Sequence, residues 1–219
     1  MRFNCNLIVL NLSNDLANGG SNLTAQQHAH HRFPERMAFL LNNPIRRKLN
    51  LLERLISKLG IDSNDVVVDF GCGPGFITIP LAKVACKAIG VDVSQRMLER
   101  ADRYAKRAHV SVELLQSDGS DLKLADKSVD LILLNHVFHE VENKRTTLSE
   151  FLRVLRPSGR VAIVEKTRGG GVFSGKFGPP IINEEEVTQE LKGAGFASVQ
   201  AIPYGKDSVI LGQKAAPGS

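Results

Sequence analysis

Val66-Val-Val-Asp-Phe-Gly-Cys-Gly-Pro-Gly-Phe-Ile-Thr78 is the stretch of sequence that decides the fold. Its three successive valines are typical of a strand that is buried on both faces of a parallel sheet. Gly71, Gly73 and Gly75 follow the strand, and glycines let the backbone turn sharply and approach a ligand closely. A helix that begins just after them points its unpaired N–H groups at the gap. The stretch therefore predicts a strand, a tight turn and a helix start around a ligand site.

The spacing of these glycines separates two classes of nucleotide-binding turn. Dinucleotide binders use G-x-G-x-x-G, in which the third glycine lies one position later than Gly75 does here, and this disfavours a nicotinamide-dependent dehydrogenase. The order of an acidic Asp69 followed by G-x-G-x-G instead resembles motif I of class I S-adenosylmethionine-dependent methyltransferases. That resemblance implies S-adenosyl-L-methionine as the cofactor and S-adenosyl-L-homocysteine as the product.

Acidic residues follow the next two apolar runs in the order that the resemblance implies. The first run ends in Asp92, the position at which the family places an acid for both ribose hydroxyls, and a carboxylate accepts two hydrogen bonds from a diol well. The second run, 110–116, precedes Asp118, which matches the acid that holds the adenine amino group. Ser120 and Asp121 remain alternatives for that contact.

The resemblance implies a set of cofactor contacts spread over these motifs. Within it, Cys72 is interpreted as a small residue that fills the glycine turn, rather than as a nucleophile. The expected contacts are Asp69, Gly71, Cys72, Gly73, Gly75, Asp92, Val93, Asp118, Gly119 and Asn135.

Two histidines just beyond the fourth predicted strand are candidates for acid–base chemistry. His136 and His139 lie where ligands meet an open α/β sheet, and a hydroxyl, thiol or protonated amine needs a base to become a nucleophile. The same histidines are also interpretable as polar residues that fill the loop. A metal site made of the two histidines and Glu140 is a weaker interpretation than either of these, and we predict no metal.

The alternation of apolar runs and helical periods predicts a Rossmann-like α/β fold, a three-layer α/β/α sandwich. A turn signal at 203–206 predicts that the last strand runs antiparallel, as the resemblance to the seven-stranded methyltransferase fold implies. Pro80 is expected to shorten or kink the first crossover helix. The predicted helices are 43–59, 76–85, 95–107, 144–155 and 184–194, and the predicted strands are 66–69, 87–92, 110–116, 130–135, 160–165, 197–202 and 207–212.

One domain with a short appendage accounts for the chain. Residues 1–30 are rich in Asn, Gln, Ser and Gly without a sustained period, and we expect a flexible N-terminal extension. Residues 31–219 are expected to form the methyltransferase domain, with the amphipathic helix 43–59 at its start. The glycine- and proline-rich segment 168–180 is expected to be a mobile loop near the substrate.

Composition limits the classes of protein to which the chain can belong. Its 219 residues are 42% hydrophobic, and no apolar run approaches the roughly 20 residues that span a bilayer, so membrane insertion is not expected. Asparagines interrupt 3–12, the segment that comes nearest to a signal peptide. The three cysteines lack metal-ligand spacing and favour free thiols in a reducing cytoplasm.

The net charge of +5 is concentrated in residues 1–58, which carry eight Lys or Arg against three acids. Such an excess is either a solvated helix face or a docking surface for nucleic acid or protein. After the fourth strand, Asn135-His-Val-Phe stands in place of the Asn-Pro-Pro-Tyr or Asp-Pro-Pro-Tyr of enzymes that methylate exocyclic amines of bases. This difference disfavours a nucleic-acid substrate.

From about residue 31 onward the sequence is similar to the small-molecule methyltransferases that include ubiquinone and menaquinone biosynthesis enzymes. His31-Arg-Phe, Asn43-Pro-x-Arg-Arg and Gly178-Pro-Pro further resemble an uncharacterised prokaryotic subgroup. The resemblance implies in-line methyl transfer to an O, N, S or C nucleophile of a small-molecule acceptor. The alternatives are an RNA or protein methyltransferase that docks through the basic N-terminal helix, and a non-catalytic protein that binds S-adenosylmethionine.

Overall fold

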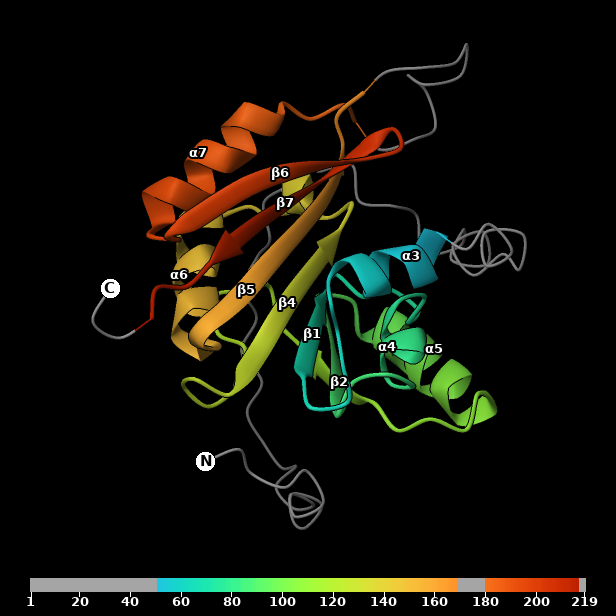
Figure 1. Ribbon diagram of the computed structural model, residues 1–219. Helices are drawn as coiled ribbons and strands as arrows, with labels where there is room; N and C mark the ends of the chain where they lie inside the picture. Colours follow the sequence, from blue (N-terminus) through green and yellow to red (C-terminus); the bar gives the residue numbers. More distant parts are fainter. Residues whose placement is uncertain (1–50, 169–179, 217–219) are drawn as a thin grey trace, which may run out of the picture.

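The strands of the computed structural model, which describes residues 51–168 and 180–216, form one sheet in the order β3-β2-β1-β4-β5-β7-β6 (Figure 1). They are β1 Val66–Phe70, β2 Lys87–Asp92, β3 Glu113–Gln116, β4 Val129–Asn135, β5 Leu155–Lys166, β6 Ser198–Tyr204 and β7 Asp207–Gln213. The helices are α3 Leu51–Lys58, α4 Thr78–Leu81, α5 Gln95–Arg107, the 3-10 helix η3 Phe138–Glu140, α6 Lys144–Val154 and α7 Glu184–Ala194.

Strand direction confirms the predicted fold class. β1 lies between β2 and β4 and pairs with both in parallel, so that Val68 is opposite Ile89 on one side and Ile132 on the other. β7 is antiparallel to both β5 and β6. From β1 the chain adds β2 and β3 on one side, and it then returns to add β4 on the other side of β1. The strand order therefore reverses between β1 and β4, and ligands of open α/β sheets bind at such a switch point.

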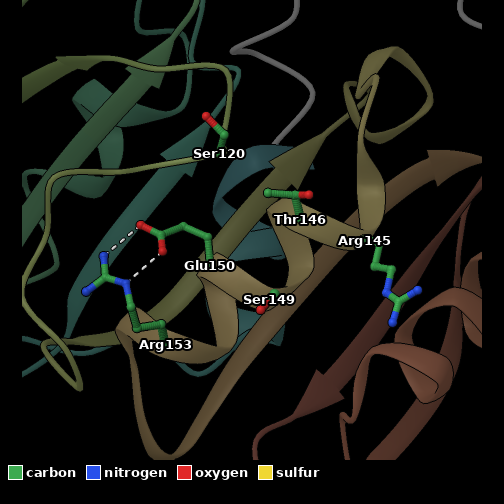
Figure 2. A pocket seen from close by; sticks show the side chains of 6 residues that line it. All are labelled: Ser120, Arg145, Thr146, Ser149, Glu150 and Arg153. Carbon is green, nitrogen blue, oxygen red and sulfur yellow. Dashed lines mark hydrogen bonds and ion pairs between the residues drawn. The ribbon is translucent and has the colours of Figure 1, made fainter.

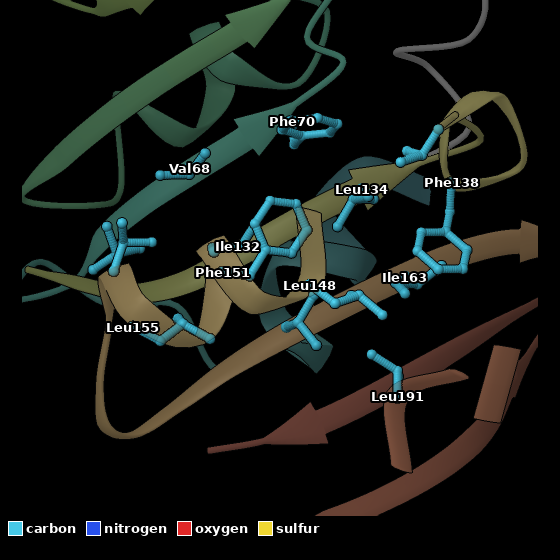
Figure 3. Close-up of a cluster of buried hydrophobic side chains, with 14 of the residues drawn as sticks. Val68, Phe70, Ile132, Leu134, Phe138, Leu148, Phe151, Leu155, Ile163 and Leu191 are labelled. Atoms are coloured by element: carbon cyan, nitrogen blue, oxygen red, sulfur yellow. The ribbon is translucent and has the colours of Figure 1, made fainter. Parts of the chain in front are cut away.

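Helices cover both faces of the sheet and produce the predicted three layers (Figure 1). Successive side chains of a strand point to opposite faces, so Val67 packs in the cluster beneath α3 and α4, whereas Val68 packs beneath α6 and α7. Figure 3 shows the second of these clusters, in which Phe151 of α6 points toward the sheet. The Phe151 ring is fully buried and meets Phe70 edge to face, with the ring centroids 5.2 Å apart.

Capping side chains fix the helix starts where the sequence predicts them. The Ser94 hydroxyl accepts a hydrogen bond from the Met97 N–H at 3.4 Å, and Asn183 Oδ1 accepts one from the Glu185 N–H at 3.0 Å. Gly195 ends α7 with a φ of 103°. α4 is only four residues long, which confirms the expected effect of a proline in this crossover.

The start of the third strand was predicted three residues too early. The Val110 N–H does not enter the sheet, because it bonds back to the Ala105 carbonyl at 3.1 Å and closes the end of α5. His109 takes the left-handed conformation, with a φ of 54°, that this kind of helix end requires. β3 therefore begins at Glu113.

Residues 156–159, which separate the predicted helix 144–155 from the predicted strand 160–165, instead form a bulge within β5. Val129 of β4 is opposite Leu155 of β5, and Leu131 is opposite Arg160. Between these two pairs β5 therefore contains more residues than β4 does. Pro157 has no N–H to give to the ladder, and a left-handed Ser158 bends the chain outward.

The terminal hairpin is tighter than predicted. Pro203 and Tyr204 belong to β6, where they pair with Ser208 and Asp207 of β7. The turn shrinks to two residues that begin with a left-handed Gly205, as the twist of an antiparallel pair favours.

Several sequence expectations concern residues outside the described ranges. These are the extension 1–30, the first part of helix 43–59, the basic surface of residues 1–50 and most of the loop 168–180. In the part of that helix that the structure describes, α3 is helical to Lys58, and Gly60 follows with a φ of 60°.

One cysteine thiol, the predicted absence of membrane spans and the predicted absence of a metal can be compared with the described residues. Cys72 is a buried free thiol, as the sequence predicts, and Cys5 lies outside the described residues. No helix within the described ranges is long and apolar enough to cross a membrane. Among the same residues, no group of three or more His, Cys, Asp or Glu side chains is arranged to hold a metal ion.

Removing the Phe151 ring tests the packing of α6 on the sheet. Phe151→Ala is expected to lower the free energy of unfolding by about 3–5 kcal/mol, because it leaves a cavity that the rigid strands cannot fill. Urea denaturation followed by circular dichroism measures the loss. Ile181→Ala is the control, since Ile181 is 52% exposed, and an equal loss in both variants would contradict the packing argument.

Candidate functional site

The glycine turn after β1 has the open backbone that the sequence predicts. Gly71, Gly73 and Gly75 have φ angles of 73°, 52° and 84°, a region that L side chains rarely adopt. A Cβ at Gly71 would lie 2.4 Å from the Val137 side chain, whereas one at Gly73 would meet nothing within 4 Å. Gly71 therefore allows close packing against the loop after β4, and Gly73 borders open space.

Asp92, at the end of β2, ties this turn to the start of α5. Its Oδ2 accepts a hydrogen bond from the Gly73 N–H at 2.8 Å, and its Oδ1 accepts one from the Ser94 N–H at 2.9 Å. Asp92 is only partly buried. The geometry places the carboxylate beside the open turn, where a ligand diol can reach it.

Asp69 lies in a different environment. It is 3% exposed and accepts a hydrogen bond from the Thr78 hydroxyl at 2.6 Å. Burial, which outweighs the hydrogen bonds from Thr78, raises the pKa of Asp69 to about 6, and the nearby charge of Asp92 also acts upward. Asp69 therefore braces the turn against α4 from the inside.

Val93 and Asp118 line up beyond the ends of β2 and β3. Val93 is 41% exposed, an unusual position for a valine, and its carbonyl accepts a hydrogen bond from Gln116 Nε2 at 3.0 Å. Asp118 is exposed, and its Oδ1 accepts bonds from the Ser120 N–H at 2.9 Å and hydroxyl at 2.7 Å. The side-chain bond from Ser120 is the main cause that lowers the pKa of Asp118, so the carboxylate is ionised at neutral pH.

The alternative acid, Asp121, is engaged elsewhere. Its carboxylate accepts a hydrogen bond from the Lys123 N–H at 2.8 Å and forms an ion pair with the Lys123 ammonium. Gly119, between the two acids, has a φ of 93°, and a Cβ there would lie 2.8 Å from Thr147. Asp118 is therefore the better placed of the two acids to receive a ligand.

A clamp on α6 holds the loop that carries Asp118. A shallow hollow of about 350 Å³ lies there. Figure 2 shows that the guanidinium of Arg153 forms two hydrogen bonds with the Glu150 carboxylate in this hollow. Glu150 also accepts the Leu122 N–H at 2.8 Å, and Arg153 also bonds the Leu124 carbonyl at 2.9 Å. Glu150 and Arg153 thus hold the loop in place.

The other side of the switch point is formed by the end of β4. Asn135 is partly buried, and His136 follows with a φ of 56°, held in place by a 2.8 Å hydrogen bond from its N–H to the Val164 carbonyl. His136 Nε2 lies 3.4 Å from a carboxylate oxygen of Asp207. Its Nδ1 is buried and makes no hydrogen bond to any described residue.

His139 contacts a residue that the sequence prediction missed. Its Nδ1 lies 3.1 Å from both carboxylate oxygens of Glu165, which is fully buried at the end of β5. Burial lowers the pKa of His139, but the hydrogen bond and charge of Glu165, aided by Glu140, outweigh it and raise the pKa above its ordinary value. The available signal was an acid that ends the otherwise apolar run from Val161.

The comparisons with known proteins agree with this arrangement. A family model described as a methyltransferase domain matches residues 68–163, which include the glycine turn, Asp92, Asp118 and both histidines. Residues 68–163 of the chain are therefore similar to a methyltransferase domain. A crystal structure of an S-adenosylmethionine-dependent methyltransferase from Aquifex aeolicus superimposes with a TM-score of 0.73 at 27% identity, covering 83% of this chain and 98% of that one.

Curated relatives of the methyltransferase domain include enzymes named for quinone biosynthesis. A demethylmenaquinone methyltransferase of Lactobacillus johnsonii is 31% identical over 121 residues, which are 53% of this chain and 50% of that protein. A ubiquinone biosynthesis O-methyltransferase of Rickettsia canadensis is 33% identical over 126 residues, covering 56% of this chain and 50% of that protein. The chain thus spans about half the length of these relatives.

Closing the open space at Gly73 tests the cofactor side. Gly73→Ala is expected to weaken binding of S-adenosylmethionine by about tenfold or more, because the added methyl enters the space beside Asp92. Isothermal titration calorimetry measures the affinity. Gly60→Ala is the matched control, since Gly60 has a similar φ of 60° and equally free surroundings. Both variants should lose about 1 kcal/mol of stability, and equal binding by the two would contradict the assignment.

The buried Asp69 predicts a pH-dependent stability. Because the folded state holds the Asp69 proton with a pKa of about 6, against 3.8 for the free group, the ionised carboxyl destabilises the fold as the pH rises through this range. Asp69→Asn keeps an acceptor for Thr78 without the charge. Its stability advantage over the wild type is expected to grow by roughly 1–2 kcal/mol between about pH 5 and pH 8 in urea denaturation. An advantage that is the same at both pH values would exclude this cause.

Proposed function

We propose that the protein transfers the methyl group of S-adenosylmethionine to an O, N, S or C nucleophile of a small-molecule acceptor. The observation that carries this proposal is the pairing of an open glycine turn and Asp92 on one side of the switch point with two histidines on the other. The names of the quinone-biosynthesis relatives support a small-molecule acceptor.

The cofactor side offers groups that match the parts of S-adenosylmethionine. Asp92 would accept hydrogen bonds from the ribose hydroxyls, the exposed Val93 would lie against the adenine, and Asp118, beside Gly119, would meet the adenine edge. The open space at Gly73, with Cys72 as a small buried residue beside it, would admit the amino acid portion. When bound, the sulfonium supplies an activated methyl group.

The protein chiefly aligns the reactants in such a reaction. Methyl transfer is an in-line displacement, so a rigid turn that sets the methyl carbon against the acceptor supplies much of the rate enhancement. Asn135 and His136 lie where β4 meets the glycine turn, since Gly71 would touch Val137 if it carried a side chain. His136 and His139 are the proposed bases for an acceptor that must lose a proton.

A second hollow suggests how the acceptor enters. It has a volume of about 690 Å³ and is lined by α3 and the tip of the β6–β7 hairpin, including Arg54, Lys58 and Tyr204. Tyr204 pairs with Asp207, which contacts His136, so the hollow opens on the histidine side of the sheet edge.

We propose the cytoplasm, where S-adenosylmethionine is made, as the compartment.

Transfer of label from methyl-labelled S-adenosylmethionine into fractions of host extract tests the proposed function. The wild type is expected to label the small-molecule fraction. Asp92→Ala should weaken cofactor binding by roughly tenfold to a hundredfold, because it removes charge-assisted hydrogen bonds, and should label little. Label in RNA or protein instead would overturn the acceptor class.

A matched substitution separates loss of the site from loss of the fold. Asp102 is a partly exposed acid on α5 that pairs with Lys106 at 2.7 Å, and Asp102→Ala should keep full labelling. Thermal unfolding should show both variants folded at the assay temperature. Undiminished cofactor binding by folded Asp92→Ala would count against the cofactor site itself.

A further inference from the structure

Glu165 is an ionisable side chain with no access to solvent, placed at the carboxyl end of β5. β4 and β7 flank it, because β5 pairs with both and Ser208 lies directly opposite Glu165 on β7. A buried carboxylate is costly unless other groups compensate its charge. The partners of Glu165 therefore indicate what it is for.

Two histidines share this carboxylate. His139 approaches with its backbone N–H at 3.3 Å from Oε1 and with Nδ1 at 3.1 Å from each oxygen. His136 Nδ1 lies 3.9 Å from Oε2, close enough for charge interaction but beyond hydrogen-bond distance. Both imidazoles come from the loop after β4, the side of the switch point opposite the cofactor turn.

We propose that Glu165 is the positioning residue of the proposed methyl transfer, and that it orients His139 so that Nε2 takes the proton of the acceptor. The inference rests on the proposed function for the identity of the reaction. The arrangement of Glu165 and His139 itself can be measured without an acceptor.

The contact with Glu165 determines which nitrogen of His139 can act. An ionised carboxylate only accepts hydrogen bonds, so the neutral imidazole must carry its hydrogen on Nδ1 and leave the lone pair on Nε2. The side chain of His139 remains 16% exposed, so its imidazole can be reached from outside. In other general-base sites, too, an acid orients a histidine and the histidine takes the proton.

Charge is conserved when the proton moves to His139. The acceptor's X–H bond breaks and its proton passes to Nε2, while X bonds to the methyl carbon and the carbon–sulfur bond breaks with its electron pair left on sulfur. The positive charge lost from the sulfonium therefore appears on the imidazolium. Buried Glu165, at 3.1 Å, is in position to stabilise that charge.

Other charged groups around His139 modify this effect. Glu140 of η3 lies 3.8 Å from Nε2, and its negative charge favours the imidazolium, whereas the positive charge of Lys144 on α6 opposes it. His136, from the loop after β4, faces the pair, and Asp207 of β7 lies beyond His136. Glu165 differs from all of these because it alone hydrogen-bonds Nδ1 of His139 among the described residues.

The test is a nitrogen-15 NMR titration of the histidines in the intact protein, with His139→Gln used to assign the signal. The wild type is expected to show neutral His139 in the Nδ1–H tautomer, with a pKa above the ordinary histidine value. Glu165→Gln should lower that pKa and let the Nε2–H tautomer appear. Glu140→Gln is the matched control, since it removes a nearby carboxylate but should keep the Nδ1–H tautomer.

With a labelled acceptor in hand, Glu165→Gln is expected to reduce kcat by about tenfold or more and to move the rising limb of the pH profile to lower pH, with the cofactor affinity unchanged. Glu165→Asp, which keeps the charge, should recover part of the loss. A dominant Nε2–H tautomer in the wild type would overturn the inference even if Glu165→Gln fails to fold. Absence of any methylated product, with the tautomer as expected, would instead count against the proposed function.

Discussion

The parallel pairing of β1 with β2 on one side and β4 on the other is the constraint from which the site follows. The Asp69–Leu133 and Asp69–Gly90 registers bring the carboxyl ends of all three strands to one edge of the sheet. β1 must leave this edge abruptly, and the N–H groups of Gly71 and Cys72 both bond the Val91 carbonyl as it does so. The open turn and the end of β4 are therefore neighbours because of hydrogen bonds between backbones.

The acids at this edge have environments that suit different tasks. Asp92 is partly exposed and accepts hydrogen bonds from two backbone N–H groups, so it organises the glycine turn. Asp69 is buried, and burial makes its ionised form unfavourable even though the Thr78 hydroxyl donates a hydrogen bond to it. Glu165 is equally buried but has a histidine as its partner, so a positive charge can form beside it. Burial alone does not assign a role to an acid, and its nearest polar neighbour does.

Local chemistry explains why some boundaries were predictable from the sequence and others were not. Ser94, Asn183 and Gly195 determine helix ends through bonds to residues within a few positions, so the sequence is sufficient there. The start of β3 and the bulge in β5 depend on whether a backbone N–H finds a strand or a helix end as its partner. The Val110 N–H bonds the Ala105 carbonyl, and Leu155 pairs with Val129 of β4. Residue types alone do not indicate these partners.

The sequence by itself determined the class of fold and the glycine turn, because these depend on residue types at fixed spacings, and it predicted that Asp92 and Asp118 follow the next two strands. The tertiary structure alone showed that Asp69 is enclosed and that Glu165 faces His139. Glu165 and His139 are far apart in the chain, on β5 and in the loop after β4, and they meet only because β4 and β5 pair in parallel. Such contacts arise from strand register across the sheet, which a single sequence does not encode position by position.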